Sequence, residues 1–300
     1  MTQMHSIAPY LQTSESPSNA WRAYNSTDMA EINDVVSNLI CEHSMELAKD
    51  SASLNYSHRL IHGNSVNIMH MKYGGTVKIR TRKLSPFVIV TMPIVGTTSY
   101  RCGNERGLAT STTAFMPKPD KEFAFGWQAD CESLAIRIER NVIEQRLSEM
   151  LGRPLTRALD FDLEMPIATG AGRQWLAALR SLIQYLEYGA NDPDTRRLLP
   201  EYEQLLITTL LYVQPHNYSS ALCANNNTAP RHIRIAEKYL QENASQVIDA
   251  QSLVELTGIQ ESSLWRAFKQ HRGCSPFQYL RFVRLQRARM ELLDPSMDIN

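Results

Sequence analysis

Hydrophobic and polar positions follow two different periods along this chain, and the period changes twice. The first helical pattern begins where Ser26 or Thr27 can cap a helix and extends to about Leu47. The polar segment before it, residues 1–25, is interrupted by prolines, and we expect it to form a loose arm. The apolar positions of the helix lie three or four residues apart and include Ile32, Val35, Val36, Leu39 and Ile40.

Short apolar or alternating runs replace the helical period between residues 58 and 138. Turn signals containing glycine or proline separate these runs, and no long helical pattern lies between them. This spacing predicts a small antiparallel barrel or a double-sheet sandwich. The runs are Val66–Tyr73, Thr76–Arg82, Phe87–Ile94, Thr112–Met116, Phe123–Trp127 and Leu134–Ile138.

The helical period returns at Asn141. Asn141 and Glu144 resemble a capping box, and Gly152 stands where this helix would end. Two longer helices are predicted over residues 173–188 and 200–213, and both carry broad apolar stripes. These stripes either pack on each other and on the barrel or form part of a dimer interface. Periodicity alone favours neither alternative.

A linker, residues 215–230, is bounded by prolines, is rich in Asn, Ser and Ala, and carries no formal charge. Beyond it an apolar helical face extends to Asn243. Asp249 can then cap a short second helix, and Gly258 can end that helix in the left-handed conformation. A further helix begins near Gln260. Two helices joined by a tight glycine turn are typical of a helix-turn-helix.

The helix that follows Gly258 has two different faces. Leu264 and Phe268 are four residues apart, so both are expected to pack against the preceding helix. The opposite face suits a DNA major groove, since Arg can bind guanine edges and Lys can reach phosphates. The alternative is an ordinary solvated helix face. The residues of the opposite face are Ser262, Trp265, Arg266 and Lys269.

The distribution of charge favours the DNA-binding alternative. The chain of 300 residues has 31 Lys and Arg and 31 Asp and Glu, so its net charge is zero and it is not a wholly basic coat protein. Residues 260–290 nevertheless carry seven cations and the single anion Glu261, a local charge of 7 − 1 = +6. Such a segment favours binding to a polyanion. The cations are Arg266, Lys269, Arg272, Arg281, Arg284, Arg287 and Arg289.

The composition also points to a cellular compartment. No apolar run approaches the roughly 18 residues that a membrane span needs, and the first residues lack the features of a secretory signal. The five cysteines are scattered and form no CxxC pair, which argues against a disulfide framework. We therefore expect a protein of the reducing cytoplasm that does not enter a membrane.

One stretch near the C-terminus has a specific spacing. Residues 273–288 give the pattern G-x-S-P-x-x-Y-L-R-x-x-R-L-x-x-A, in which a glycine ends one helix and Ser275-Pro276 starts the next. Together with Leu264–Phe268, this stretch resembles the first half of the DNA-binding domain of the AraC/XylS family of bacterial transcription regulators.

This resemblance has two implications for DNA binding. The family carries two helix-turn-helix units joined by a long helix, here residues 276–293, and we expect the second unit to be missing because the chain stops at Asn300. In the family, the positions of Ser262, Trp265 and Arg266 face bases. The predicted DNA-binding residues are Ser262, Trp265, Arg266, Lys269, Glu261, Arg272 and Arg281.

The N-terminal half is similar to the ligand-binding part of the XylS-like branch, whose barrel binds a small effector such as an aromatic acid. The resemblance implies an aromatic pocket in which arginines could meet a carboxylate. The alternative is that the aromatic residues are core and the arginines are solvated edge residues. The predicted effector-binding residues are Arg80, Arg82, Tyr100, Phe115, Phe125 and Trp127.

A barrel enzyme is a further alternative, since small double-sheet barrels include metal-dependent enzymes. His58, His62 and His70 form the one histidine cluster, but no His-x-His pair accompanies a suitable downstream Glu. No phosphate-binding loop or nucleophile motif is present either. We therefore predict no catalytic residue, no metal and no cofactor.

These observations predict an α+β protein. Its N-terminal part is a small antiparallel β-barrel, cupin-like and with flanking helices, and its C-terminal part is a truncated all-α helix-turn-helix domain. The predicted organisation is an arm (1–25), a ligand-binding barrel with dimerisation helices (26–214), a linker (215–230) and a partial DNA-binding domain (231–300).

The predicted function is that of a ligand-responsive transcription regulator. It would be an activator, with double-stranded DNA, a small aromatic effector, a second copy of the chain and RNA polymerase as partners. A second hypothesis is a truncated regulator that binds its ligand and dimerises but binds DNA only weakly. The barrel enzyme is the third.

Overall fold

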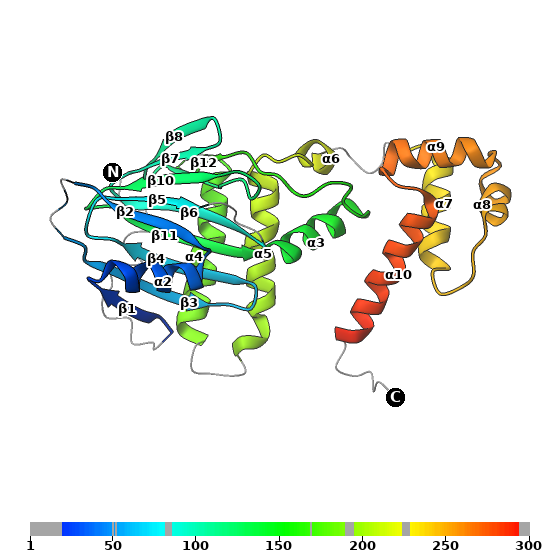
Figure 1. The fold of residues 1–300 in the computed structure, drawn as a ribbon. Coiled ribbons are helices and arrows are strands. Elements are labelled where there is room, and N and C mark those ends of the chain that lie inside the picture. Colours follow the sequence, from blue (N-terminus) through cyan, green and yellow to red (C-terminus); the bar gives the residue numbers. More distant parts are fainter. Residues whose placement is uncertain are drawn as a thin grey trace. The chain divides into compact units, whose positions relative to one another are not determined.

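The computed structural model describes residues 20–49, 51, 53–81, 86–168, 170–189, 195–223 and 229–293. The chain folds into two units, whose elements are labelled in Figure 1. The first unit contains the described residues up to Arg146 and those from Asp160 to Asn217. The second contains residues 147–159 and the described residues from Tyr218 onward. The chain thus passes between the units three times, after Arg146, Leu159 and Asn217.

Two antiparallel sheets form the centre of the first unit and confirm the predicted cupin-like barrel. The larger sheet has the order β1 (Arg22–Ser26), β3 (Tyr56–His62), β4 (Val66–Lys72), β11 (Glu132–Glu139), β6 (Phe87–Val95), β9 (Thr113–Phe115) and β12 (Glu164–Pro166). The smaller sheet has the order β2 (His43–Leu47), β5 (Val77–Thr81), β10 (Phe123–Trp127), β7 (Thr98–Cys102) and β8 (Glu105–Ala109).

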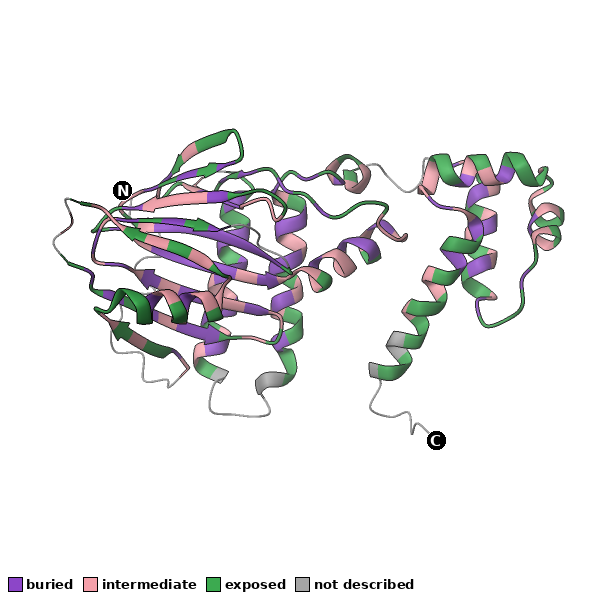
Figure 2. Ribbon diagram, in the orientation of Figure 1, coloured by how far each residue is buried: buried purple, intermediate pink, exposed green. Residues whose placement is uncertain are grey.

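Burial along the strands shows which faces lie inside. On β5 the side chains of Val77, Ile79 and Thr81 are buried, whereas Lys78 and Arg80 between them are exposed. Such alternation is expected for a strand with one face in water. Strands β6 and β11 are buried along most of their length, as the continuous purple in Figure 2 shows. Both faces of β6 are covered along most of its length, so its sequence is apolar almost without alternation, whereas β11 ends in an alternating stretch in which Arg137 and Glu139 are partly exposed.

A helical layer covers the larger sheet in the first unit. Helices α4 (Gly172–Gly189) and α5 (Leu199–Val213) pack side by side behind the strands in Figure 1, and a short 3-10 helix, η1 (Thr195–Leu198), precedes α5. Tyr185 and Tyr202 stack between the two helices, with ring centroids 4.3 Å apart. The side chains of Trp175, Leu179 and Leu206 are fully buried. Most of each apolar stripe therefore belongs to the core of this unit.

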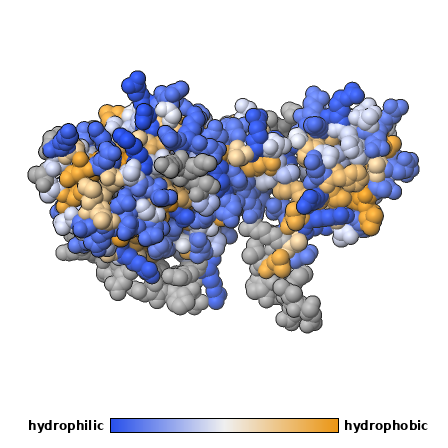
Figure 3. Space-filling view, viewed as in Figure 1, coloured by the Kyte–Doolittle hydropathy of each residue, from blue (hydrophilic) through white to orange (hydrophobic). Residues whose placement is uncertain are grey.

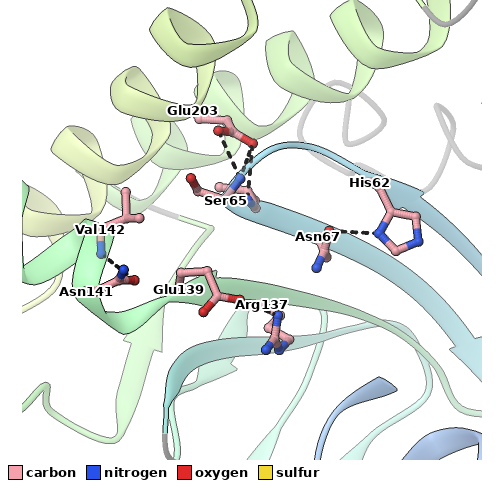
Figure 4. Close-up of polar contacts among 9 residues, drawn as sticks. His62, Ser65, Asn67, Arg137, Glu139, Asn141, Val142 and Glu203 are labelled. Carbon is pink, nitrogen blue, oxygen red and sulfur yellow. Dashed lines mark hydrogen bonds and ion pairs between the residues drawn. The ribbon is translucent and has the colours of Figure 1, made fainter. Parts of the chain in front are cut away.

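Glu203 on α5 fastens this layer to the sheet (Figure 4). Its carboxylate accepts hydrogen bonds from the backbone N–H groups of Asn64 (2.7 Å), Ser65 (3.0 Å) and Val66 (3.1 Å), in the turn between β3 and β4. Gly63 is needed here, because a Cβ atom at this position would lie 2.1 Å from Glu203 Oε1. Burial raises the pKa of Glu203, and the three N–H donors oppose that shift.

The second unit is helical and has a core of its own. Its helices are α6 (Ser219–Cys223), α7 (Arg231–Glu242), α8 (Ala250–Thr257), α9 (Glu261–Arg272) and α10 (Pro276–Leu293). The helix signals seen in the sequence operate as expected. Asp249 Oδ1 accepts from Ser252 N at 2.8 Å, and Gly258 adopts a φ of 68° after α8. Ser275 and Gln278 cap each other's backbone N–H groups at the start of α10. Apolar side chains from several helices are fully buried: Ile233, Leu240, Leu253, Leu264 and Phe268.

Residues 147–159 belong to the helical unit. The segment begins within α3 (Arg140–Leu151), whose first residues belong to the first unit. The Tyr218 hydroxyl accepts from the backbone N–H groups of Thr156 (3.0 Å) and Arg157 (2.7 Å), and it donates to the Arg157 carbonyl (2.7 Å). A Cβ atom on Gly273, which ends α9, would lie 2.7 Å from Arg153 Nη1. This segment therefore packs closely against the end of α9.

Three sequence predictions near the N-terminus were wrong. The helix that was expected to reach Leu47 is α2 (Met29–Leu39), and the strand β2 follows it. Neither Ser26 nor Thr27 caps α2, since Asp28 Oδ1 accepts from Glu31 N at 2.9 Å. Residues 22–25, expected in the arm, belong to β1 (Arg22–Ser26), which pairs with β3. Residues 1–19 of the predicted arm lie outside the described residues.

We predict that Glu203→Ala destabilises the protein by about 2 to 3 kcal/mol, because it leaves three backbone N–H groups in a partly buried turn without their acceptor. Urea denaturation would measure the loss. Glu201→Ala is the matched control, since Glu201 is exposed on the same helix. Equal stability of the two variants would contradict the role assigned to Glu203.

Candidate functional site

The first candidate surface lies on α9, the second helix of the helix-turn-helix. Leu264 and Phe268 are fully buried and hold α9 against the rest of the unit. The other side of α9 is open to solvent, and it is mainly hydrophilic in Figure 3. Five of its side chains are exposed: Ser262, Ser263, Arg266, Lys269 and Gln270. Glu261, in the first turn of α9, is exposed as well.

Trp265 is half-buried rather than fully exposed. Its ring meets the edge of Phe277 on α10, with centroids 5.7 Å apart. One part of the indole therefore supports the packing of α9 on α10, and the remaining part is accessible beside Arg266. Ser263 and Gln270 were not among the predicted DNA-binding residues. Ser263 lies three residues before Arg266 and Gln270 four residues after it, and this helical spacing is the sequence signal that identifies them.

Several cations of the basic segment are used inside the unit. Arg272, a predicted DNA-binding residue, forms a two-pronged ion pair with Glu237 on α7, including a 2.9 Å contact from Nη2 to Oε2, and both side chains are 13% exposed. Arg284 donates to the backbone carbonyls of Ala244 (2.7 Å) and Gln246 (2.6 Å), and Arg287 donates to that of Gln241. Arg272 thus binds a carboxylate of its own unit, contrary to the role predicted for it.

The exposed cations among the described side chains of this segment are Arg266 and Lys269 on α9 and Arg281, Arg284 and Arg287 on α10, of which Arg284 and Arg287 already donate to backbone carbonyls. Because Glu237 neutralises Arg272, the local charge counted from sequence overstates the positive charge that can meet a ligand. The segment nevertheless places two accessible cations, Arg266 and Lys269, on the face of α9 that carries small polar residues.

The second candidate site is a narrow slot between the two sheets of the first unit. The slot is narrow, since the centre of a water-sized sphere can occupy only about 40 Å³ of it, and its walls are mostly aromatic and aliphatic. Of the predicted effector-binding residues, Phe115, Phe125 and Trp127 line it. Tyr100 does not line it, because its ring stacks on Phe115 from behind and its hydroxyl donates to Glu164. Further lining residues include Ile79, Met71, Ile89 and Phe123.

Four of the residues that line the slot each carry a buried polar atom that has no hydrogen-bond partner among the described residues. These atoms are Nε2 of His43, the hydroxyl of Tyr73, Oγ1 of Thr81 and Nε1 of Trp127. A buried polar group without a partner costs free energy, so their gathering in one slot indicates a place for a ligand. The sequence analysis missed His43 because it assigned residues 43–47 to a helix, although the alternation of that stretch is typical of a strand.

The predicted arginines lie elsewhere. Arg80 on β5 and Arg101 on β7 both stand opposite Ala124 of β10, on the outer face of the smaller sheet. They line an outer cleft together with Glu42 and Glu122. Arg82 lies outside the described residues. The structure thus separates Arg80 from the aromatic interior in which the sequence analysis combined it with the rings.

The histidine cluster is engaged in pairwise contacts. Nδ1 of His58 lies 3.0 Å from the Tyr56 hydroxyl, and Nε2 of His70 lies 3.2 Å from Oε2 of Glu132. Within the part of the chain that the structure describes, no group of three His, Cys, Asp or Glu residues could hold a metal ion. Nor is any described helix both long and apolar enough to span a bilayer.

Comparison with known families gives two matches along the chain. Residues 32–211 match the AraC-binding-like domain, and residues 253–300 match a helix-turn-helix domain. The first match covers the two sheets apart from β1, together with nearly all of the helical layer, and the second covers most of α8 together with α9 and α10.

Curated relatives match most of the chain. The "Probable thc operon regulatory protein" of Rhodococcus erythropolis is 26% identical over 93% of this chain and 86% of its own length. The "XylDLEGF operon transcriptional activator 1" of Pseudomonas putida is 22% identical over 89% of this chain and 81% of its own length. Among solved structures, the AraC-like transcriptional activator CuxR is 11% identical, with a TM-score of 0.48, over 90% of this chain and 96% of its own.

We predict that Gln260→Ser stabilises the helical unit by about 1 kcal/mol, because Gln260 is the N-cap of α9 and its side chain makes no capping hydrogen bond. Thermal denaturation of the full chain would show the gain. Asp249→Ala, which removes an existing cap from α8, should lower the stability by a similar amount. A Gln260→Ser variant no more stable than the parent would contradict the prediction.

Proposed function

Because the chain belongs to the AraC/XylS family of transcription regulators, we propose that it is an activator that responds to a small aromatic effector and binds DNA through α9. Its relatives are transcription regulators and not enzymes. The proposal is that the slot between the sheets receives the effector and that α9 enters the major groove of double-stranded DNA.

The observation that carries the DNA-binding part is the exposed face of α9. Arg266 and Lys269 are accessible there, and Ser262 lies one turn before Arg266. Arg266 can pair with a guanine edge, Lys269 can reach a phosphate, and small Ser262 allows close approach to the bases. Trp265 would contribute its accessible edge, and Glu261 could accept from a cytosine amino group. Arg281 on α10 remains a candidate phosphate contact.

The accessible stripe on α5 supports the proposal of a homodimer. Leu198, Leu205 and Tyr212 lie seven residues apart and are 58%, 51% and 65% exposed. Large apolar side chains repeating at this interval are typical of a helix seam that a partner helix covers. A second copy of the chain is the partner that we propose. A dimer would present two α9 helices to two half-sites of an operator.

The aromatic residues that line the slot support an aromatic effector, because their side chains can pack favourably against the flat ring of a ligand. The P. putida relative is named as a transcriptional activator. We extend that role to this chain, with RNA polymerase as the partner that an activator contacts. The proposed site of action is the cytoplasm, where bacterial DNA is located.

We predict that the double variant Arg266→Ala/Lys269→Ala weakens binding to a mixed-sequence DNA duplex. Each lost phosphate contact reduces the slope of log affinity against log salt concentration by about 0.9, so the slope should fall by about 1 to 2. Gel retention between about 30 and 300 mM salt would measure both effects.

Lys238→Ala is the matched control for this experiment. Lys238 is 75% exposed on α7, outside the α9 face, so its removal should leave the slope unchanged. Arg272→Ala should reduce the stability of the unit, because it leaves Glu237 without its partner. Retention of the parent chain that did not change with salt would refute electrostatic DNA binding.

We predict that Leu205→Glu converts the dimer to a monomer, because it places a charge in the centre of the apolar seam. Sedimentation velocity of the full chain would report the change. Leu108→Glu introduces the same charge at a leucine that is 53% exposed on β8, outside the seam, and should remain dimeric. A monomeric parent, or a dimeric Leu205→Glu variant, would exclude this interface.

A further inference from the structure

The polar atoms in the slot lie at its two ends. His43 pairs in register with Thr81, and Thr81 pairs with Phe123. Four residues further along the same strands, Leu47 pairs with Val77, and Val77 pairs with Trp127. At about 3.4 Å per residue the two rows are about 14 Å apart. His43 and Thr81 therefore mark one end of the slot and Trp127 marks the other. Tyr73 belongs to the Trp127 end, since its ring centroid is 5.0 Å from that of Trp127.

The His43 end is the open one. His43, Thr81 and Phe123 line both the slot and the outer cleft on the smaller sheet. The Trp127 end is closed, because Tyr73 is fully buried and Trp127 is 1% exposed. A molecule entering from the cleft would therefore reach Tyr73 and Trp127 with its leading end and would leave its trailing end beside His43.

The chemistry of each end can be assigned. Trp127 Nε1 is only a donor, so the leading end of the ligand needs a hydrogen-bond acceptor. His43 Nδ1 lies 3.0 Å from the Cys41 carbonyl oxygen, which can only accept, so Nδ1 carries the hydrogen. Burial lowers the pKa of His43 and keeps the ring neutral at pH 7. His43 Nε2 is then an acceptor, and the trailing end of the ligand needs a donor.

Charge provides the last constraint. No described residue that lines the slot carries a formal charge at neutral pH. The thiol of Cys41 also lines the slot, and it is uncharged at neutral pH because burial raises its pKa to about 11. In the outer cleft Arg80 and Arg101 face Glu42 and Glu122, so the charges balance, and Arg80 is already 3.9 Å from Glu46. Among the residues that the structure describes, neither the slot nor its mouth supplies an uncompensated cation for a carboxylate.

We infer that the slot takes an uncharged, flat and elongated aromatic molecule, with a hydrogen-bond acceptor at its buried end and a donor at its open end. This inference rests on the proposed function in one respect, namely that the slot is the effector site. It replaces the aromatic acid expected from sequence with a neutral compound. Trp127 and Tyr73 would bind the acceptor, and His43 would accept from the donor.

A matched pair of probes tests the charge requirement. 6-Hydroxy-2-naphthamide and 6-hydroxy-2-naphthoate share one skeleton, and at neutral pH they differ in the charge at one end. Isothermal titration calorimetry on the full chain should show the amide binding at least about tenfold more tightly, because the slot offers a carboxylate no counter-charge. Equal or tighter binding of the naphthoate, or no binding of the naphthamide, would overturn the inference.

Tryptophan variants test the position of the buried end. Trp127→Phe keeps the ring but removes the N–H donor, and it should weaken naphthamide binding by about three- to tenfold. Trp175→Phe is the matched control, because Trp175 is equally buried, also has an Nε1 without a partner among the described residues, and lies outside the slot. Unchanged affinity in Trp127→Phe would overturn the assignment of Trp127.

The outcomes separate this inference from the proposed function. If the chain binds DNA with the expected salt dependence but prefers the naphthoate, the regulator remains and the neutral ligand is wrong. If the naphthamide binds as predicted but no DNA is retained at low salt, the slot assignment stands and the regulator function fails.

Discussion

The carboxylate of Glu203 connects the two layers on which the rest of the first unit depends. Its side chain points inward to three backbone N–H groups of the turn between β3 and β4, while Leu205 and Tyr212 on the same helix point to solvent. The position of α5 on the sheet is thus fixed by a small number of directional bonds. The contact with that turn therefore also orients any surface of α5 that binds a partner.

The two candidate sites follow opposite physical principles. On α9, Leu264 and Phe268 are buried and the opposite face is polar and open to solvent. Its cations are surrounded by water, so they are accessible to a charged partner from outside the unit. In the slot water is excluded, so a hydrogen bond from an unpaired donor or acceptor to a ligand is stronger than it would be in water. A polyanion suits the first environment and a neutral aromatic molecule suits the second. One chain can hold both because each site lies in a unit with its own core.

Local signals predicted the helices well and the sites only partly. Asp249, Gly258 and Ser275 act within a few residues of themselves, so the sequence shows where α8, α9 and α10 begin or end. Arg272 and Glu237 are 35 residues apart, and no local pattern reveals that they pair. No local pattern shows which side of its strand faces the interior at Arg80, because that depends on the second sheet. The strand β2 was missed because it is short and closely follows α2.

The passage of residues 147–159 through the helical unit limits how the protein can be divided. A chimera that exchanged everything from residue 215 onward would appear from sequence to transfer a complete module. It would leave Thr156 and Arg157 without the Tyr218 hydroxyl or with a foreign one, and Arg153 without Gly273. The exchangeable module therefore consists of two separate pieces of sequence, and grafting this helical unit onto another sensor requires both.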